Sequence, residues 1–199
     1  MRLKIVQAGE PVLRQAARPL SAEEIRMPAT GELLTHMRET MRDAPGVGLA
    51  APQVGLGIQL AVIEDRPEYM TGIAPETLAA RERSPVEFIA LFNPRIVDYS
   101  DDTAEFFEGC LSVAGFSALV RRSHRVTVEY LDEKAELQRI EGAGWFARIL
   151  QHEIDHLGGR LYLDLMETRT FSTIENLTRH WKDLSTPALR DKLGITDRS

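Results

Sequence analysis

The chain has 199 residues, of which 43% are hydrophobic and 27% are charged, and this composition predicts one globular domain over residues 1–199. The net charge of -6 gives no general attraction to nucleic acid or to an anionic membrane, so we expect no sequence-specific nucleic-acid binding. No stretch has the length and apolarity of a membrane span, and residues 1–7 lack the apolar core of a signal peptide, which predicts a cytoplasmic location.

The N-terminal part of the chain predicts a packed arm followed by a helix. Ser21 and Glu24 have the spacing of a capping box, and apolar residues recur at helical intervals as far as Arg42. Because Pro28 interrupts this pattern, we expect the main helix to begin after Thr30.

Residues 44–55 are rich in glycine, alanine and proline. The Gly-x-Gly at residues 46–48 is a weak phosphate-loop signal, since no Lys-Ser or Lys-Thr follows it. Small residues would also let the backbone approach a ligand closely, with Gln53 offering a polar side chain at the end of the stretch. An ordinary turn is the alternative.

The middle of the chain alternates predicted strands with polar segments. Strands are expected at residues 58–64, at 87–98 with a break or bend at 93–94, and at 125–131 and 137–141 as an antiparallel hairpin. Residues 65–85 are polar with three prolines, which predicts a surface insertion of little catalytic interest. The acidic run that ends at Glu108 is of a kind that usually forms a solvated face. A second helix is expected over residues 168–184, with Ile174 facing inward, and a loosely held tail follows beyond Pro187.

The strongest single feature is the HExxH sequence at residues 152–156. On a helix, His152 and His156 lie on one face and can direct two imidazoles at one metal ion, while Glu153 can reach a water on that metal. The alternative is a chance match on a solvated helix. However, the histidines continue the apolar face of the preceding residues, where unpaired imidazoles are costly, and a metal is the simplest partner for both.

A catalytic metal needs a third ligand. Tyr162 stands where a metzincin has its third ligand, which excludes that class. Glu167 or Glu175 would serve in a gluzincin. Cys110, the single cysteine, is the better candidate, because a thiolate binds Zn²⁺ or Fe²⁺ strongly and two histidines plus one cysteine leave a fourth position open.

Three stretches together resemble the signature motifs of the peptide deformylases: residues 46–53 (GVGLAAPQ), 108–112 (EGCLS) and 151–157 (QHEIDHL). Their order and separations fit that family. The resemblance implies an α+β fold with antiparallel β-sheets around a central HExxH helix, an N-terminal helix, and a C-terminal helix with its tail within residues 168–199. It also implies metal-dependent removal of the formyl group from N-formylmethionine on nascent polypeptides, with release of formate.

The resemblance assigns roles to individual residues. One divalent metal, most commonly Fe²⁺ with Zn²⁺, Ni²⁺ or Co²⁺ as replacements, would be held by Cys110, His152 and His156. Glu153 would act as general base and acid, and the Gln53 amide and the Leu111 backbone N–H would stabilise the oxyanion that forms on the formyl group. Substrate backbone contacts are expected at Val47, Gly48 and Gly109. The pocket for the substrate side chain would be lined by Trp145, Arg148 and Ile149.

Some positions depart from the common bacterial pattern. Ala114 replaces a frequent proline, and residues 112–116 (SVAGF) look more like the mitochondrial-type deformylases. An arginine that many bacterial members carry near Ser117 is missing. Arg148 is unexpected beside a methionine, and an ion pair with an acid outside the pocket is the alternative for this side chain. These departures concern selectivity and efficiency.

Rival functions stay open at this point. One is a metallopeptidase with the same metal centre, and another is a deformylase-like protein that acts on other formylated or acylated amines. A non-enzymatic protein that docks at the ribosome through residues 168–192 is a third, although the basic character of this region is slight. Retention of Glu153, Gln53 and the ligand set favours the enzyme.

Overall fold

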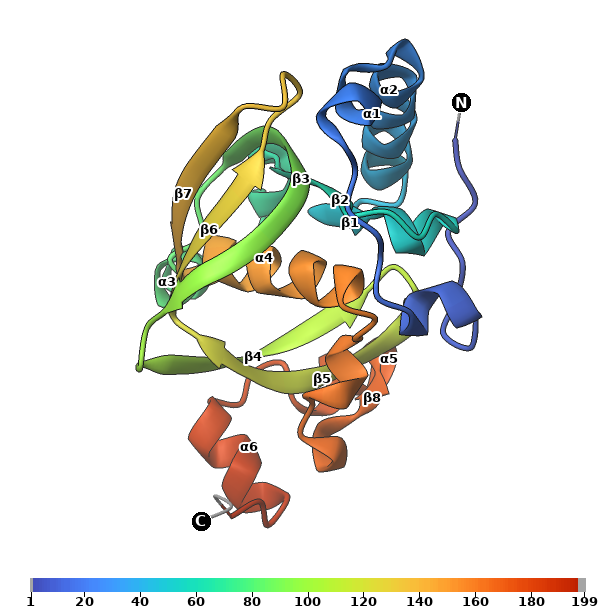
Figure 1. Cartoon of the computed structure of the whole chain (residues 1–199). Helices are drawn as coiled ribbons and strands as arrows, with labels where there is room; N and C mark the ends of the chain where they lie inside the picture. Colours follow the sequence, from blue (N-terminus) through green and yellow to red (C-terminus); the bar gives the residue numbers. More distant parts are fainter. Residues whose placement is uncertain (1, 197–199) are drawn as a thin grey trace.

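The computed structural model describes residues 2–196, in which two antiparallel sheets lie on either side of one long helix (Figure 1). The five-stranded sheet has the order β1 (Gly48–Ala50), β2 (Leu60–Asp65), β3 (Val86–Tyr99), β6 (Arg125–Leu131) and β7 (Leu137–Ala143). The three-stranded sheet consists of β4 (Thr103–Cys110), β5 (Val113–Ser123) and β8 (Ser172–Thr173). The helix between them, α4 (Gly144–Leu157), contains the HExxH residues. The predicted mixed α+β class with antiparallel sheets is confirmed.

Strand β3 is continuous but bends at Asn93. This residue has a positive φ of 49°, and the pairing register with β6 shifts between Phe92 and Arg95. Asparagine tolerates this conformation better than most residues, and here its side chain also bonds both the N–H and the carbonyl of Leu20, each at 2.8 Å. The bend expected at residues 93–94 therefore exists, and it anchors the N-terminal arm on the sheet.

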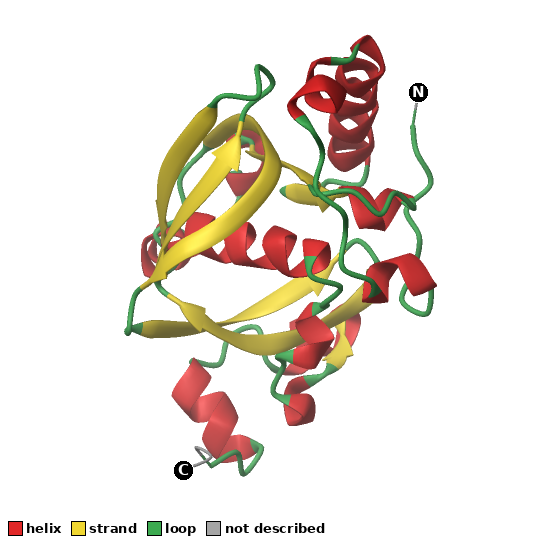
Figure 2. Ribbon diagram, in the orientation of Figure 1, coloured by secondary structure: helices red, strands yellow, loops and turns green. Residues whose placement is uncertain are grey.

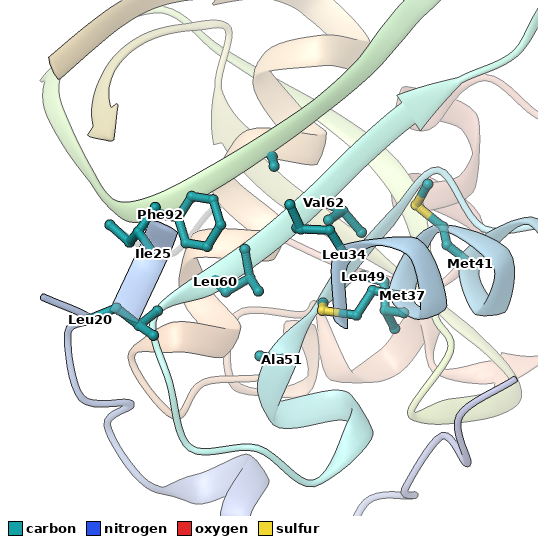
Figure 3. Close-up of a cluster of buried hydrophobic side chains, with 11 residues drawn as sticks. Leu20, Ile25, Leu34, Met37, Met41, Leu49, Ala51, Leu60, Val62 and Phe92 are labelled. Carbon is teal, nitrogen blue, oxygen red and sulfur yellow. The ribbon is translucent and has the colours of Figure 1, made fainter. Parts of the chain in front are cut away.

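The N-terminal helices lie at the β1–β2 end of the five-stranded sheet (Figure 1). The capping box of Ser21 and Glu24 begins α1 (Ala22–Arg26), as predicted. Helix α2 (Pro28–Asp43) starts earlier than expected, because Pro28 occupies its first turn, where a missing N–H costs no helical hydrogen bond. Between this helix and the sheet lies a buried apolar cluster, shown in Figure 3 and formed by Leu20, Ile25, Leu34, Met37, Met41, Leu49, Ala51, Leu60, Val62, Ala90 and Phe92.

The segment after α4 differs from the prediction of one helix over residues 168–184. It contains the 3-10 turn η5 (Thr168–Thr170), strand β8, and two short helices, α5 (Ile174–His180) and α6 (Thr186–Lys192) (Figure 2). Residues 172–173 are extended because they pair with β5, and Ile174 is 49% exposed rather than inward. The expectation of a loose tail beyond Pro187 is wrong for α6, since Leu189 is buried. The end of that tail, residues 197–199, lies outside the described residues.

Short elements complete the chain: η1 (Pro11–Arg14), η2 (Ala51–Val54), η3 (Pro67–Met70), α3 (Pro75–Ala80) and η4 (Tyr162–Asp164). Within residues 2–196, no helix combines the length and the apolarity that a membrane crossing requires.

Candidate metal centre

The fold brings the three predicted ligands together from two elements. Cys110 is the last residue of β4, whereas His152 and His156 are one turn apart on α4. The Cys110 Sγ lies 3.3 Å from His156 Nε2, and one ligand atom from each of the three residues lies within 4.8 Å of the other two. Glu167 and Glu175, the alternatives for the third ligand, belong to no such group within the described residues.

A layer of polar side chains fixes this group between β4, β5 and α4. The alternation along a strand places Glu108 of β4 and Arg122 of β5 on one face of the small sheet. On α4, Arg148, His152 and Asp155 recur at the spacing of one helix face. The two faces meet, so that charged groups are buried where an apolar contact would be usual.

Glu108 is the centre of the layer. Its carboxylate accepts a bond from His152 Nδ1 at 2.9 Å, two bonds from Arg122 at 2.6 and 3.0 Å, and one from Arg148 at 2.5 Å. Burial alone would raise the pKa of Glu108, but the bonds from His152 and Arg122 outweigh it and hold the pKa well below its usual range. The prediction of a solvated acidic face is therefore wrong at Glu108, which is 4% exposed.

The ionised Glu108 determines which ring nitrogen of His152 carries a proton. A carboxylate only accepts hydrogen bonds, so His152 Nδ1 must carry a proton and the lone pair of a neutral ring is at Nε2. Burial lowers the pKa of His156 well below its ordinary value, which keeps that imidazole neutral. For His152, burial lowers the pKa, but the bonds to Cys110 and Glu108 outweigh it and raise the pKa well above its ordinary value, so this ring would give up its Nε2 proton on binding an ion. Two imidazole nitrogens beside a thiol are a donor set that transition metals accept, and the residues present fit such an ion.

Arg122 and Arg148 also connect the sheet to the helix. Arg122 Nη1 donates to Asp155 at 2.7 Å, in addition to its bonds with Glu108. Arg148, besides Glu108, donates to the carbonyls of Val120 at 3.0 Å and Ala104 at 2.7 Å. The ion-pair alternative considered for Arg148 thus describes its contacts, although both it and Glu108 border the cavity described below.

Glu153 lies against strand β1, in contact with Gly48. It is 4% exposed, and one of its carboxyl oxygens has no hydrogen-bond partner among the described residues. Burial raises the pKa of Glu153 to about 7, although the nearby charges of His152 and Arg122 lower it. Its side chain contacts Gly48 so closely that a Cβ at that position would lie 2.6 Å from the carboxyl carbon. Glycine at 48 is therefore a steric requirement for this position of Glu153.

Gln53 directs its amide group at the ligands. Its side-chain oxygen Oε1 accepts the Ala50 N–H at 2.8 Å, so the side-chain nitrogen Nε2 faces Cys110 Sγ at 3.5 Å and Ser112 Oγ at 3.4 Å. The N-terminal arm also bonds to these residues. The Val6 N–H donates to the backbone carbonyl of Gln53 at 2.9 Å, and the Gln7 side chain donates to the backbone carbonyl of Leu111 at 3.0 Å.

Comparison with known proteins places the chain in a family. A family model described as polypeptide deformylase matches residues 2–171. The chain belongs to this family. It is 46% identical to peptide deformylase 3 of Streptomyces avermitilis over 97% of this chain and 84% of that protein. It is 44% identical to the chloroplastic peptide deformylase 1A of Solanum lycopersicum over 96% of this chain and 67% of that protein.

The fold agrees with solved deformylase structures. A class I type b peptide deformylase from Acinetobacter baumannii with bound Met-Ala-Ser superposes with a TM-score of 0.75 at 32% identity. The match covers 83% of this chain and 99% of that one. Mitochondrial relatives also occur, among them the human protein at 36% identity over 85% of this chain and 70% of that protein.

In this deformylase-family chain, a cavity of about 650 Å³ opens beside Cys110 and His152. The substrate-contact residues predicted from the sequence all border it: Val47, Gly48, Gly109, Trp145, Arg148 and Ile149. Gln53, Leu111 and Glu153 border it as well. The cavity also includes residues that the sequence analysis did not single out for the site, among them Ile5, Gln7, Arg83, Phe116 and Ile174.

The segment at residues 65–85, predicted to be a surface insertion, contributes Arg83 to the cavity wall and contains a buried residue, Asp65. Arg83 makes two 2.8 Å bonds to the fully buried Asp65. The guanidinium groups of Arg81 and Arg83 lie over the Trp145 ring, 4.8 and 5.4 Å from its centroid. The backbone N–H of Trp145 also donates to the Arg81 carbonyl at 2.8 Å, whereas its buried indole N–H has no partner among the described residues. These contacts hold the indole in the wall.

Proposed function

We propose that this chain is a peptide deformylase that hydrolyses the N-formyl group of N-formylmethionine on nascent polypeptides and releases formate. The observation that carries the proposal is the grouping of Cys110, His152 and His156 with Glu153 and Gln53 at one cavity, in a chain of the deformylase family. The whole of residues 1–199 would act as one domain.

The metal would be held by Cys110, His152 and His156, with Fe²⁺ in the cell and Zn²⁺, Ni²⁺ or Co²⁺ as replacements. The thiol and imidazole donors support this choice, since all four ions accept nitrogen and sulfur ligands. When bound, such a metal supplies Lewis-acid polarisation of the formyl carbonyl and a more acidic water. Glu108 would keep His152 in its ligand form through the bond to Nδ1.

Glu153 would move the protons of the reaction. Its carboxyl has an unpartnered oxygen and a pKa of about 7, raised by burial, which suits a group that must both accept and release a proton near neutral pH. It would take the proton of the attacking water and deliver it to the amine nitrogen as the C–N bond breaks. Formate and a free N-terminal methionine result.

Gln53 and Leu111 would stabilise the negative oxygen that develops on the formyl group. The Gln53 amide is oriented in advance by the Ala50 N–H, so little reorganisation is needed when charge develops. The Leu111 backbone N–H would be the second donor. Val47, Gly48 and Gly109 would contact the substrate backbone, and Trp145 and Ile149 the methionine side chain. Arg148, which is engaged with Glu108, would position the polar layer rather than touch the substrate.

The location and partners are part of the proposal. We propose the cytosol as the compartment, and cell fractionation tests it, because relatives of this chain include chloroplastic and mitochondrial proteins. Any ribosome contact would use residues 168–192. Arg169, Arg179 and Arg190 of this region bond to partners within the chain, so we expect only weak, salt-sensitive cosedimentation with ribosomes.

The test is formate release from formyl-Met-Ala-Ser by protein purified without oxygen, with metal content measured on the same sample. We expect formate in proportion to bound metal, no cleavage of unformylated Met-Ala-Ser, and a loss of about 10²–10⁴-fold in Glu153→Gln at unchanged metal content. Metallated protein that releases no formate from formyl-Met-Ala-Ser, but hydrolyses other formylated or acylated amines, would refute the assignment. Cleavage of the unformylated peptide would indicate a metallopeptidase.

A further inference from the structure

Three large apolar side chains gather at the cavity mouth, where burial would be expected. Phe116 is 38% exposed, Phe171 39% and Ile174 49%, and we name this group the apolar rim. The rings of Phe116 and Phe171 stack with their centroids 5.0 Å apart and their planes 8° from parallel. Phe116 and Ile174 border the same cavity as His152 and Glu153. The rim is therefore continuous with the proposed active site.

The rim is held in place by regular pairing. Strand β8 pairs with β5, with Phe116 opposite Thr173 and Ser117 opposite Ser172. Ser117 Oγ donates to the Glu108 carbonyl at 2.7 Å, which connects this edge to the strand that carries Cys110. The Thr173 side chain caps α5 and so fixes the helix that begins with Ile174. The side chains of the apolar rim are thus exposed on regular, hydrogen-bonded backbone, and an exposed apolar surface of this kind marks a contact site.

The C-terminal segment supplies one part of the apolar rim. The family match ends at residue 171, so Ile174 and the α5 that follows lie outside it, yet Ile174 reaches the cavity. A peptide whose formyl group lies at Cys110 and Glu153 must leave the cavity through its mouth. An extended peptide rises about 3.3 Å per residue, so the residues just after the methionine are those that pass the mouth.

We propose that the apolar rim binds an apolar side chain at the second or third residue of the formylated peptide, and that this chain therefore favours substrates with such a residue. The inference rests on the proposed deformylase function. The substrate class is formyl-Met peptides with leucine, phenylalanine or a similar side chain just after the methionine. Burying that side chain against Phe116 and Ile174 removes apolar surface on both sides from water.

The experiment compares kcat/KM for formyl-Met-Ala-Ser, formyl-Met-Leu-Ser and formyl-Met-Ala-Leu in the metal-loaded protein and in Ile174→Ser and Phe116→Ser. The control is Leu137→Ser on β7, since Leu137 is 68% exposed and does not border the cavity. The readout is the ratio of a leucine peptide to formyl-Met-Ala-Ser, so a general loss of activity in a variant cancels.

We expect one leucine peptide to be preferred about tenfold by the unaltered chain and by Leu137→Ser, and this ratio to fall several-fold in both rim variants. The leucine peptide whose preference falls in the rim variants shows whether the second or the third substrate residue contacts the rim. Equal use of all three peptides, or a preference that survives both rim substitutions, would overturn the inference while deformylation stands. A rim that joins two copies of the chain would show as a dimer that Ile174→Ser dissociates without a change in the ratio, which also overturns it. Absence of formate from every peptide would instead refute the proposed function.

Discussion

Replacing Gly48 with alanine adds one methyl group at the point where Glu153 lies against β1. The new Cβ would lie 2.6 Å from the carboxyl carbon of Glu153 and 2.8 Å from its Cγ. Non-bonded carbons prefer about 3.5–4.0 Å, so the carboxylate must move by about 1 Å. Gly48 has no positive φ, so the alanine backbone itself is not strained.

A shift of this size is enough to impair proton transfer. A misplacement of about 1 Å can cost about 10²-fold in rate, which corresponds to about 2.7 kcal/mol of transition-state stabilisation. We therefore expect Gly48→Ala to lower kcat for formyl-Met-Ala-Ser about 100-fold at unchanged metal content. The matched control is Gly57→Ala, because a Cβ at Gly57 meets nothing within 4 Å. If Gly48→Ala turned over within about threefold of the unaltered chain, the position of Glu153 would not govern the reaction, and our account of Gly48 would be refuted.

Three further substitutions test other parts of the site. Gln53→Ala should lower kcat by about 10²–10³-fold with metal retained, measured by formate release and elemental analysis; a change confined to KM would argue against an oxyanion donor. Cys110→Ser should lose metal to a chelator faster than the unaltered protein, and an equal loss rate would place the third ligand elsewhere. Arg148→Met removes a charged hydrogen bond from Glu108, which keeps Arg122, so we expect a loss of about 2–3 kcal/mol in unfolding free energy and about 4–12 °C in Tm. The exposed Arg95→Met should leave Tm within about 2 °C, and an equal effect of the two would contradict the role of the buried layer.

Local patterns in the sequence predicted the parts of the site that are local in the structure. The spacing of His152 and His156 is enough to place them one turn apart on a helix. The capping box at Ser21 was predictable for the same reason, since its partners are three residues apart. The prediction that Cys110 is the third ligand rests on the chemistry of thiolates and on the resemblance, because no local pattern connects residue 110 with residue 152.

The errors concern side chains whose surroundings come from distant parts of the chain. Glu108 is buried only because the β4–β5 pairing sets Arg122 on the same face and α4 supplies Arg148 and His152. The β4–β5 pair was not predicted, so no signal for Arg122 was available. The salt bridge between Asp65 and Arg83 likewise holds a polar segment against the cavity, although the composition of that segment alone predicts a surface location.

The C-terminal segment shows the same limit. Helical periodicity favoured one helix over residues 168–184, but pairing of β8 with the edge of β5 interrupts it at residues 172–173. Pro28 is a different case. Its effect depends on its position within the helix, and at the first turn it is tolerated, whereas in the interior it would break the helix.

The origin of the three predicted ligands has a mechanical consequence for the whole molecule. Cys110 ends a strand of the small sheet, whereas the histidines belong to α4, so an ion bound by all three would fasten the small sheet to the central helix. It would act as a cross-link between residues 42 or more positions apart in the chain, much as a disulfide does. Hydrogen exchange should therefore report metal removal first in β4 and β5, while β2 and β3, buried beneath α2, keep their protection. A centre built for chemistry would in this way also set how firmly the two halves of the fold are joined.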